Sequence, residues 1–185
     1  MDVTNLKNLI PDYGKDLKLN LGTVLTPEGA PGLSPVQITG IALACAVAAR
    51  NPVVLAEIEA QAAGVLDAAH VNAARAAAAI MGMNNVYYRF VHLVGNDDYG
   101  TLPARLRMNV IGNPGIDRTD FELYSLAVSA INGCGACVAS HEKVVRKAGV
   151  GTEGVQSAVR IAAVIHGVAV ALEAVVPPVA TRQAA

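Results

Sequence analysis

A chain of 185 residues is long enough for one domain with a substantial core and short for two. Hydrophobic residues make up 53% of it, aromatic residues only 4%, and tryptophan is absent, which favours closely packed alanine-rich helices over sheets. A formal net charge of −1 gives neither the basic surface of a nucleic-acid-binding protein nor that of a protein bound to anionic lipid.

The N-terminal segment 1–18, MDVTNLKNLIPDYGKDLK, alternates charged and apolar residues and lacks the apolar core of a signal peptide. The longest uncharged run, residues 31–49, contains serine, proline, glutamine and glycine, so it is a poor membrane span. Three cysteines, one close pair and Cys45, do not make the disulfide framework of a secreted domain. We therefore expect a cytoplasmic protein without a membrane segment.

The first clear helix signal is Ser34–Gln37, SPVQ, which combines an N-cap, a proline at the first helical position and a capping-box glutamine. It predicts a helix from Pro35 to Arg50. Asn51–Pro52 then ends this helix and caps a second one, which Gly64 closes.

The third predicted helix begins at Asp67, and Gly82 is expected to interrupt it. Two polar segments rich in glycine and proline follow, at 95–103 (GNDDYGTLP) and 113–120 (NPGIDRTD). Both are predicted to be loops.

Three more helices are predicted in the C-terminal half. Thr119–Glu122, TDFE, has the pattern of a capping box and opens a helix through Ala130. Another runs from Cys134 to Gly149, and the last from Thr152 to Ala174, stopped by Pro177–Pro178. Because no convincing series of strands appears, we predict an all-α fold in one domain, 1–185.

A faint internal similarity appears when the chain is shifted by 85 residues, which places 64–82 on 149–167. It suggests two repeated halves, about 34–95 and 119–175, although an alanine-rich composition raises the number of chance matches. In this register the cysteine pair has no counterpart in the first half, so thiol chemistry is expected in the second half only.

The segment NGCGACVASHEK, residues 132–143, is compatible with several kinds of site. Haem attachment requires a histidine directly after Cys137, where a valine stands. Structural zinc requires four ligands; the two cysteines and His141 supply three, and a fourth would have to come from Glu122 or His166. Two inert buried thiols are a further interpretation.

A redox dithiol fits this segment best. The turn Asn132–Gly133 places Cys134 at the first helical position, where unpaired N–H groups and the helix dipole stabilise a thiolate. Cys137 lies three residues on, within reach of Cys134, and His141 follows it by one turn and can take or relay a thiol proton. Cys45, in an apolar helix, is expected to act as a small hydrophobic residue.

Glu122 has two interpretations. It is the third helical residue of the capping box that begins at Thr119, which is its structural interpretation. It is also a candidate for a buried carboxylate behind His141, since the two residues lie on consecutive predicted helices. Spacing alone does not show that they meet.

With Glu122, the Cys134-x-x-Cys137 pair and His141 in place, the chain resembles the AhpD-like alkylhydroperoxidase family, part of the carboxymuconolactone decarboxylase-like superfamily. The resemblance covers nearly the whole chain. It is carried by four segments: LIPDYGKDLKLNL (9–21), AAAAIMGMNNVYYRF (76–90), LRMNVIGNPGI (106–116) and FELYSLAVSAINGCGACVASHE (121–142).

The resemblance implies an all-helical homotrimer that reduces alkyl hydroperoxides and hydrogen peroxide through its dithiol, with no bound cofactor or metal. Electrons would come from NADH through dihydrolipoamide dehydrogenase and the lipoyl group of an acyltransferase, and the peroxiredoxin AhpC is a further partner. By position, Cys137 would attack the peroxide, Cys134 would resolve, and His141 would relay a proton through water toward Glu122. A mean hydropathy of +0.41 independently favours apolar surface hidden in an oligomer.

One position departs from the family that the chain resembles. Members of that family place a histidine just before the second cysteine, where this chain has Ala136. Two alternatives therefore stay open beside the peroxidase. One is an electron-transfer adaptor that reduces a peroxiredoxin and has little peroxidase activity of its own. The other is a lactone decarboxylase of the same superfamily, which the cysteine pair argues against.

Overall fold

The computed structural model describes residues 1–175, and this part of the chain is all-α, as predicted, with no strand. Pro177–Pro178, the expected stop of the last helix, lies outside the described residues. The elements are α1 (Thr4–Leu9), η1 (Asp12–Gly14), α2 (Lys15–Val24), α3 (Pro35–Ala49), α4 (Pro52–Ala62), α5 (Ala68–Leu93), α6 (Asp98–Thr101), α7 (Asn109–Gly112), α8 (Arg118–Ile131), α9 (Gly135–Lys147) and α10 (Thr152–Glu173).

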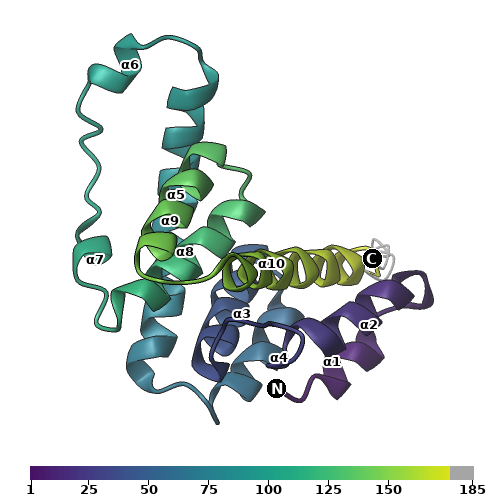
Figure 1. Cartoon of the computed structure of the whole chain (residues 1–185). Coiled ribbons are helices and arrows are strands. Elements are labelled where there is room, and N and C mark those ends of the chain that lie inside the picture. Colours follow the sequence, from purple (N-terminus) through teal and green to yellow (C-terminus); the bar gives the residue numbers. More distant parts are fainter. Residues whose placement is uncertain (176–185) are drawn as a thin grey trace, which may run out of the picture.

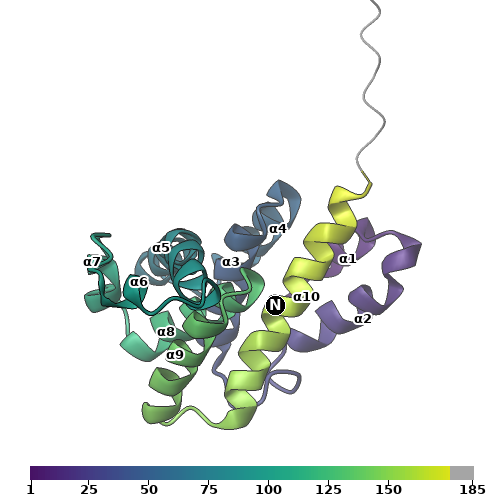
Figure 2. The same cartoon turned by 90° about the horizontal axis from the view of Figure 1, so that it is seen from above.

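Four helices form the centre of the molecule (Figure 1). Helices α3 and α8 pack against each other, and α5 and α10 each pack against both of them. Seen from above, α10 lies between α2 on one side and α8 on the other (Figure 2). The interior is filled mainly by alanine, leucine, isoleucine and valine, and Phe121 and Tyr124 are its two fully buried aromatic residues. Small side chains let these helices approach closely, as the composition predicted.

Helix α10 is long and apolar enough to cross a membrane by length and composition. Half of its most apolar window is buried inside the molecule, against α3, α8 and α2. The core helix of a globular domain has the same properties, so the feature carries little weight as a membrane span.

The local helix signals in the first half are confirmed, with one exception. Ser34 and Gln37 form the capping box, with N···O distances of 2.9 and 3.2 Å. Asn51 caps α4, and Asp67 caps α5. The predicted interruption at Gly82 is wrong, since α5 runs unbroken through it. A glycine inside a helix costs only about 1 kcal/mol, which the packing of the buried face of α5 outweighs.

The start of α8 differs from the prediction. The helix begins at Arg118, and the carboxylate of Asp117 accepts from the N–H of Thr119 at 2.7 Å. The predicted capping box of Thr119 with Glu122 is therefore wrong, because Asp117 already occupies the cap position. Glu122 is left free to turn inward, where it is buried.

Residues 94–117 form an arm that leaves the end of α5, carries α6 and α7, and returns to α8 (Figure 1). No residue of this arm is fully buried. The segment 95–103, predicted to be a loop, contains the short helix α6. The segment 113–120, also predicted to be a loop, is a connection whose last three residues form the first turn of α8.

Candidate active site

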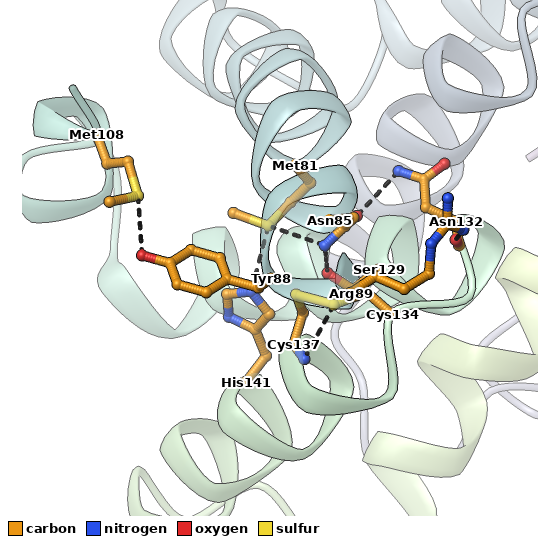
Figure 3. Close-up of a disulfide and its surroundings, with 10 residues drawn as sticks. All are labelled: Met81, Asn85, Tyr88, Arg89, Met108, Ser129, Asn132, Cys134, Cys137 and His141. Atoms are coloured by element: carbon orange, nitrogen blue, oxygen red, sulfur yellow. Dashed lines mark hydrogen bonds between the residues drawn. A yellow bond between two sulfur atoms is a disulfide. The ribbon is translucent and has the colours of Figure 1, made fainter. Parts of the chain in front are cut away.

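The two cysteines of the pair lie at the start of α9, and their sulfur atoms are joined in a disulfide (Figure 3). Cys134, predicted to be the first helical residue, is instead the N-cap of α9, which begins at Gly135, and the sulfur of Cys134 accepts from the N–H of Cys137 at 3.3 Å. The preceding Gly133 has φ +69°, a conformation that favours glycine. Cys134 is 0% exposed and Cys137 7% exposed, so Cys137 is the more exposed residue of the pair.

A network of polar side chains between α5 and the end of α8 supports this turn (Figure 3). The amide of Asn85 donates to Ser129 Oγ at 2.9 Å and accepts from Asn132 at 2.9 Å. Arg89 donates to the backbone carbonyl of Asn132 at 2.7 Å. Because both ends of the Asn85 amide are used, α5 holds the residues just before Cys134 in one arrangement.

Glu122 and His141 meet across the α8–α9 interface. His141 Nδ1 lies 2.6 Å from Glu122 Oε2, and the two side chains are 12% and 4% exposed. Arg118 lies 3.8 Å from the other carboxylate oxygen and is itself largely exposed. A carboxylate is rarely buried without a partner, and here the imidazole supplies one. Of the two interpretations of Glu122, this geometry agrees with the buried carboxylate behind His141.

The second ring nitrogen of His141 also has a neighbour. Nε2 lies 3.3 Å from the sulfur of Met81 on α5 (Figure 3). Nδ1 faces the Glu122 carboxylate and Nε2 faces the Met81 sulfur, so contacts on both sides fix the orientation of the imidazole ring.

A pocket of about 380 Å³ opens beside the disulfide. Cys137 borders it, whereas Cys134 is not among its lining residues. Its apolar walls come from α5, α7, α9 and the arm, and its polar lining groups include Asn84, Glu122 and His141. A mostly apolar pocket with a few converging polar groups and one sulfur can hold a small organic molecule against that sulfur.

Ala136 is the residue at which this chain has no histidine just before its second cysteine. It borders both this pocket and a neighbouring one of about 340 Å³, which is also lined by Tyr88 and His92. Its methyl group contributes no hydrogen-bonding group to either pocket.

The structure brings together four of the residues singled out from the sequence: Cys134, Cys137, His141 and Glu122. Cys45 is fully buried in α3, and burial raises the pKa of its thiol. His166, named above as a possible fourth zinc ligand, is exposed and lines a separate pocket of about 610 Å³. Among residues 1–175, no cluster of three or more His, Cys, Asp or Glu side chains forms a candidate metal site.

Sequence reasoning missed the contribution of α5, which supplies Met81, Asn84 and Asn85 to the site. A signal was present in the segment MGMNN, because two adjacent asparagines are unusual in the middle of an alanine-rich helix. Both are buried. Buried polar side chains at such positions indicate a network or a site.

Comparison with known proteins agrees with this site. Residues 97–178 match the carboxymuconolactone decarboxylase family. Alkyl hydroperoxide reductase AhpD of Brucella suis is 57% identical over 94% of this chain and 98% of its own length. The protein of the same name from Rhodospirillum centenum is 60% identical over 94% of this chain and 92% of its own, and that of Bradyrhizobium sp. strain ORS 278 is 58% identical over 94% of each. The chain belongs to the AhpD family of alkyl hydroperoxide reductases.

Proposed function

We propose that this protein is an alkyl hydroperoxide reductase that reduces organic hydroperoxides and hydrogen peroxide by cycling Cys134 and Cys137 between dithiol and disulfide. The names of its 57–60% identical relatives support the activity. The observation that carries the mechanism is the position of Cys137, which borders a pocket together with the hydrogen-bonded and largely buried pair of His141 and Glu122.

In the first step, the Cys137 thiol gives its proton to the His141–Glu122 couple, through water, and becomes a thiolate. The thiolate sulfur attacks the terminal oxygen of the hydroperoxide, so an S–O bond forms as the O–O bond breaks. The leaving alkoxide takes the proton from the couple and departs as the alcohol. Met81 contributes by holding the imidazole ring in place through its contact with Nε2, while Nδ1 stays against Glu122, with which it exchanges the proton.

In the second step, the sulfenic acid on Cys137 condenses with the Cys134 thiol to form the disulfide and release water. A dihydrolipoyl group then reduces the disulfide by two exchange reactions, and its own two thiols become a disulfide. Cys137 is the sulfur that borders the pocket, so we expect the dihydrolipoyl thiolate to attack there and release Cys134.

We propose a lipoylated acyltransferase with dihydrolipoamide dehydrogenase as the electron source, and AhpC as a second acceptor, in a cytoplasmic protein. No cofactor needs to be bound, since the lipoyl group arrives on its carrier. We also propose a homotrimer. Val86, Phe90 and Leu93 lie along one exposed stripe of α5, an apolar surface that a second copy would cover. A monomeric mass by light scattering would contradict the trimer.

The central experiment follows NADH oxidation in a mixture of dihydrolipoamide dehydrogenase, lipoyl carrier, this protein and an alkyl hydroperoxide. Cys134→Ser and Cys137→Ser are each expected to abolish turnover, while Cys45→Ser keeps it, since Cys45 lies in α3 away from the pocket. Turnover that survives in both site variants would overturn the proposed function.

A second candidate function is an electron-transfer adaptor for a peroxiredoxin, and Ala136 beside Cys137 favours it, because no second imidazole is available there. The test compares the rate of NADH oxidation in a mixture with peroxide alone with the rate in a mixture with peroxide and the peroxiredoxin. A much faster rate in the second mixture would favour the adaptor. A lactone decarboxylase has no use for the cysteine pair, and turnover of a muconolactone that thiol alkylation does not affect would be its signature.

A further inference from the structure

Ser140 carries a hydroxyl in the pocket beside Cys137 that the protein itself does not use. It lies on α9, it is exposed, and it is one of the residues that line this pocket. Thr23 donates to the backbone carbonyl of Leu19 in its own helix at 3.2 Å. Within residues 1–175, the Ser140 hydroxyl makes no such bond and no bond to another side chain. It is therefore available to a molecule in the pocket.

The place of Ser140 in the pocket follows from helix spacing. The face of α9 that lines the pocket consists of Ala136, Cys137, Ser140, His141 and Val144. Residues three or four apart on a helix have Cβ atoms about 5–6 Å from each other. Ser140 is thus a direct neighbour of Cys137, three residues before it. Ala136 and Val144, four residues away on either side, are apolar, so Ser140 is the hydrogen-bonding side chain of this edge of the helix.

The other polar side chains that line the pocket are Asn84, Tyr88, Arg118, Glu122 and His141. Glu122 and His141 bind each other at 2.6 Å, and Arg118 lies 3.8 Å from Glu122. The Tyr88 hydroxyl lies 4.0 Å from a methionine sulfur. Asn84 is buried and belongs to α5. None of them is both without a partner and on the helix of the reactive thiol.

We propose that Ser140 is a catalytic residue whose hydroxyl donates a hydrogen bond to the alkyl-bearing oxygen of the hydroperoxide. The inference rests on the peroxidase function proposed above. The Cys137 sulfur attacks the terminal oxygen, so negative charge develops on the second oxygen, which leaves as the alkoxide. The separation of about one helical turn leaves room for the O–O bond to lie between the sulfur and the hydroxyl.

This hydrogen bond accelerates the reaction because it strengthens as the leaving oxygen gains charge. The S–O bond forms, the O–O bond breaks, and the alkoxide takes its proton from the His141–Glu122 pair. The Ser140 proton stays on its own oxygen throughout. In a chain with Ala136 before its second cysteine, Ser140 supplies a hydrogen-bonding group that Ala136, one turn earlier, does not.

The test measures how the effect of removing the hydroxyl depends on the leaving group. With reduced protein, Ser140→Ala is expected to slow disulfide formation by tert-butyl hydroperoxide about tenfold, the effect of one lost hydrogen bond to a reacting oxygen. Peracetic acid is expected to react at nearly the wild-type rate, because its leaving group is acetate, a weak base that gains little from a donor. Stopped-flow measurement at one fixed pH gives both second-order rate constants.

Two further readouts separate an effect on the peroxide oxygen from an effect on the thiol. Alkylation of Cys137 by iodoacetamide has no oxygen leaving group, so its rate is expected to be unchanged in Ser140→Ala. Reduction of the disulfide by dihydrolipoamide is expected to be unchanged as well. The thermal midpoint is expected to stay the same or rise, because alanine has the higher helix propensity at an exposed position.

Ser140→Thr keeps a hydroxyl at this position and is expected to retain most of the rate. The matched control combines Ala139→Ser with Ser140→Ala, which moves the hydroxyl to an exposed neighbour that does not line the pocket. This double variant is expected to be as slow as Ser140→Ala.

A wild-type rate with tert-butyl hydroperoxide in Ser140→Ala would overturn the inference. An equal loss of rate with peracetic acid and iodoacetamide would also overturn it, as would a Ser140→Thr variant as slow as Ser140→Ala or full recovery in the double variant. A reduced wild-type protein that does not react with any hydroperoxide would instead overturn the proposed function itself, so the two failures are distinguishable.

Discussion

Two turns of this molecule share a backbone plan. Between α3 and α4, Arg50 has φ +61° and precedes the N-cap Asn51; between α8 and α9, Gly133 has φ +69° and precedes the N-cap Cys134. The first turn follows α3 and the second follows α8, and these two helices pack against each other in the centre of the molecule. The internal repeat predicted from the sequence stays a prediction.

The caps themselves differ in kind. Asn51 accepts from the N–H groups of Val53 and Val54, each at 3.0 Å, and donates to Glu173 at 2.8 Å. Cys134 offers a sulfur, a weak acceptor, to a single N–H at 3.3 Å. The first turn has a strong N-cap, Asn51, and no reactive group. In the second turn, the N-cap position is occupied by Cys134, a weaker cap with a reactive thiol. A local choice that weakens a helix start is expected at a functional site.

The largest difference between the two halves should appear in thiol reactivity. In the reduced protein we expect alkylation at about pH 8 to label the site pair, with Cys137 ahead, and to leave Cys45 unlabelled until unfolding. Burial raises the pKa of the Cys45 thiol, so its thiolate is absent at pH values where an ordinary thiol begins to ionise. Mass spectrometry of peptides at timed intervals checks this, and labelling of Cys45 at the rate of Cys137 would contradict it.

The next largest effect concerns Glu122, the buried carboxylate that pairs with His141 beside the second turn. Glu122→Gln is expected to slow disulfide formation by hydroperoxide about 100-fold, because the amide can neither take nor return the proton shared with His141. Glu142→Gln is the matched control, since this glutamate lies next to His141 in the chain but pairs with exposed Arg146 at 3.8 Å. Equal rates in the two variants would remove Glu122 from the mechanism.

Stability tests the strong cap. Asn51→Ala removes two accepted hydrogen bonds and leaves Glu173 without its donor, so the free energy of unfolding is expected to fall by about 1–2 kcal/mol. Urea denaturation at neutral pH measures the change. Peroxide turnover should be retained in this variant, because the turn between α3 and α4 contributes no residue to the pocket beside Cys137.

The smallest effect concerns the weak cap. Under reducing conditions, Cys134→Ser is expected to raise the free energy of unfolding by about 0.5 kcal/mol, because a hydroxyl is a better N-cap than a thiol. Turnover is lost in the same variant. Urea denaturation of this variant beside reduced wild type measures the gain, and a loss of stability would mean that the thiol fits the turn better than its capping strength suggests.

The elements that could be predicted are those whose signals are local. Ser34, Gln37 and Asn51 act within three residues of their own positions, and each prediction from them is confirmed. The error at Gly82 arose because packing across α5 overrides a local helix breaker. The error at Thr119 arose because Asp117, two residues earlier, caps the helix by accepting from the N–H of Thr119, so Thr119 already lies inside the first turn.

The part of the candidate site that could be predicted is the part whose residues are close together in the sequence. Cys134, Cys137 and His141 fall on one helix and its cap, so their proximity follows from the helix repeat. Glu122 is 19 residues from His141 and Met81 is 60 residues from it, and only the packing of α5, α8 and α9 brings them together. No local pattern indicates that Asn84 borders the pocket while Asn85 supports the turn.

The central claim is that one hydroperoxide oxidises this pair, and only this pair, in one turnover. The direct measurement mixes fully reduced protein with an equimolar alkyl hydroperoxide, quenches with an alkylating agent, and maps the cysteines by mass spectrometry. The account predicts one molecule of alcohol per protein, a Cys134–Cys137 disulfide, and an unmodified Cys45 thiol. Recovery of both site cysteines as free thiols, with the hydroperoxide unconsumed, would contradict it.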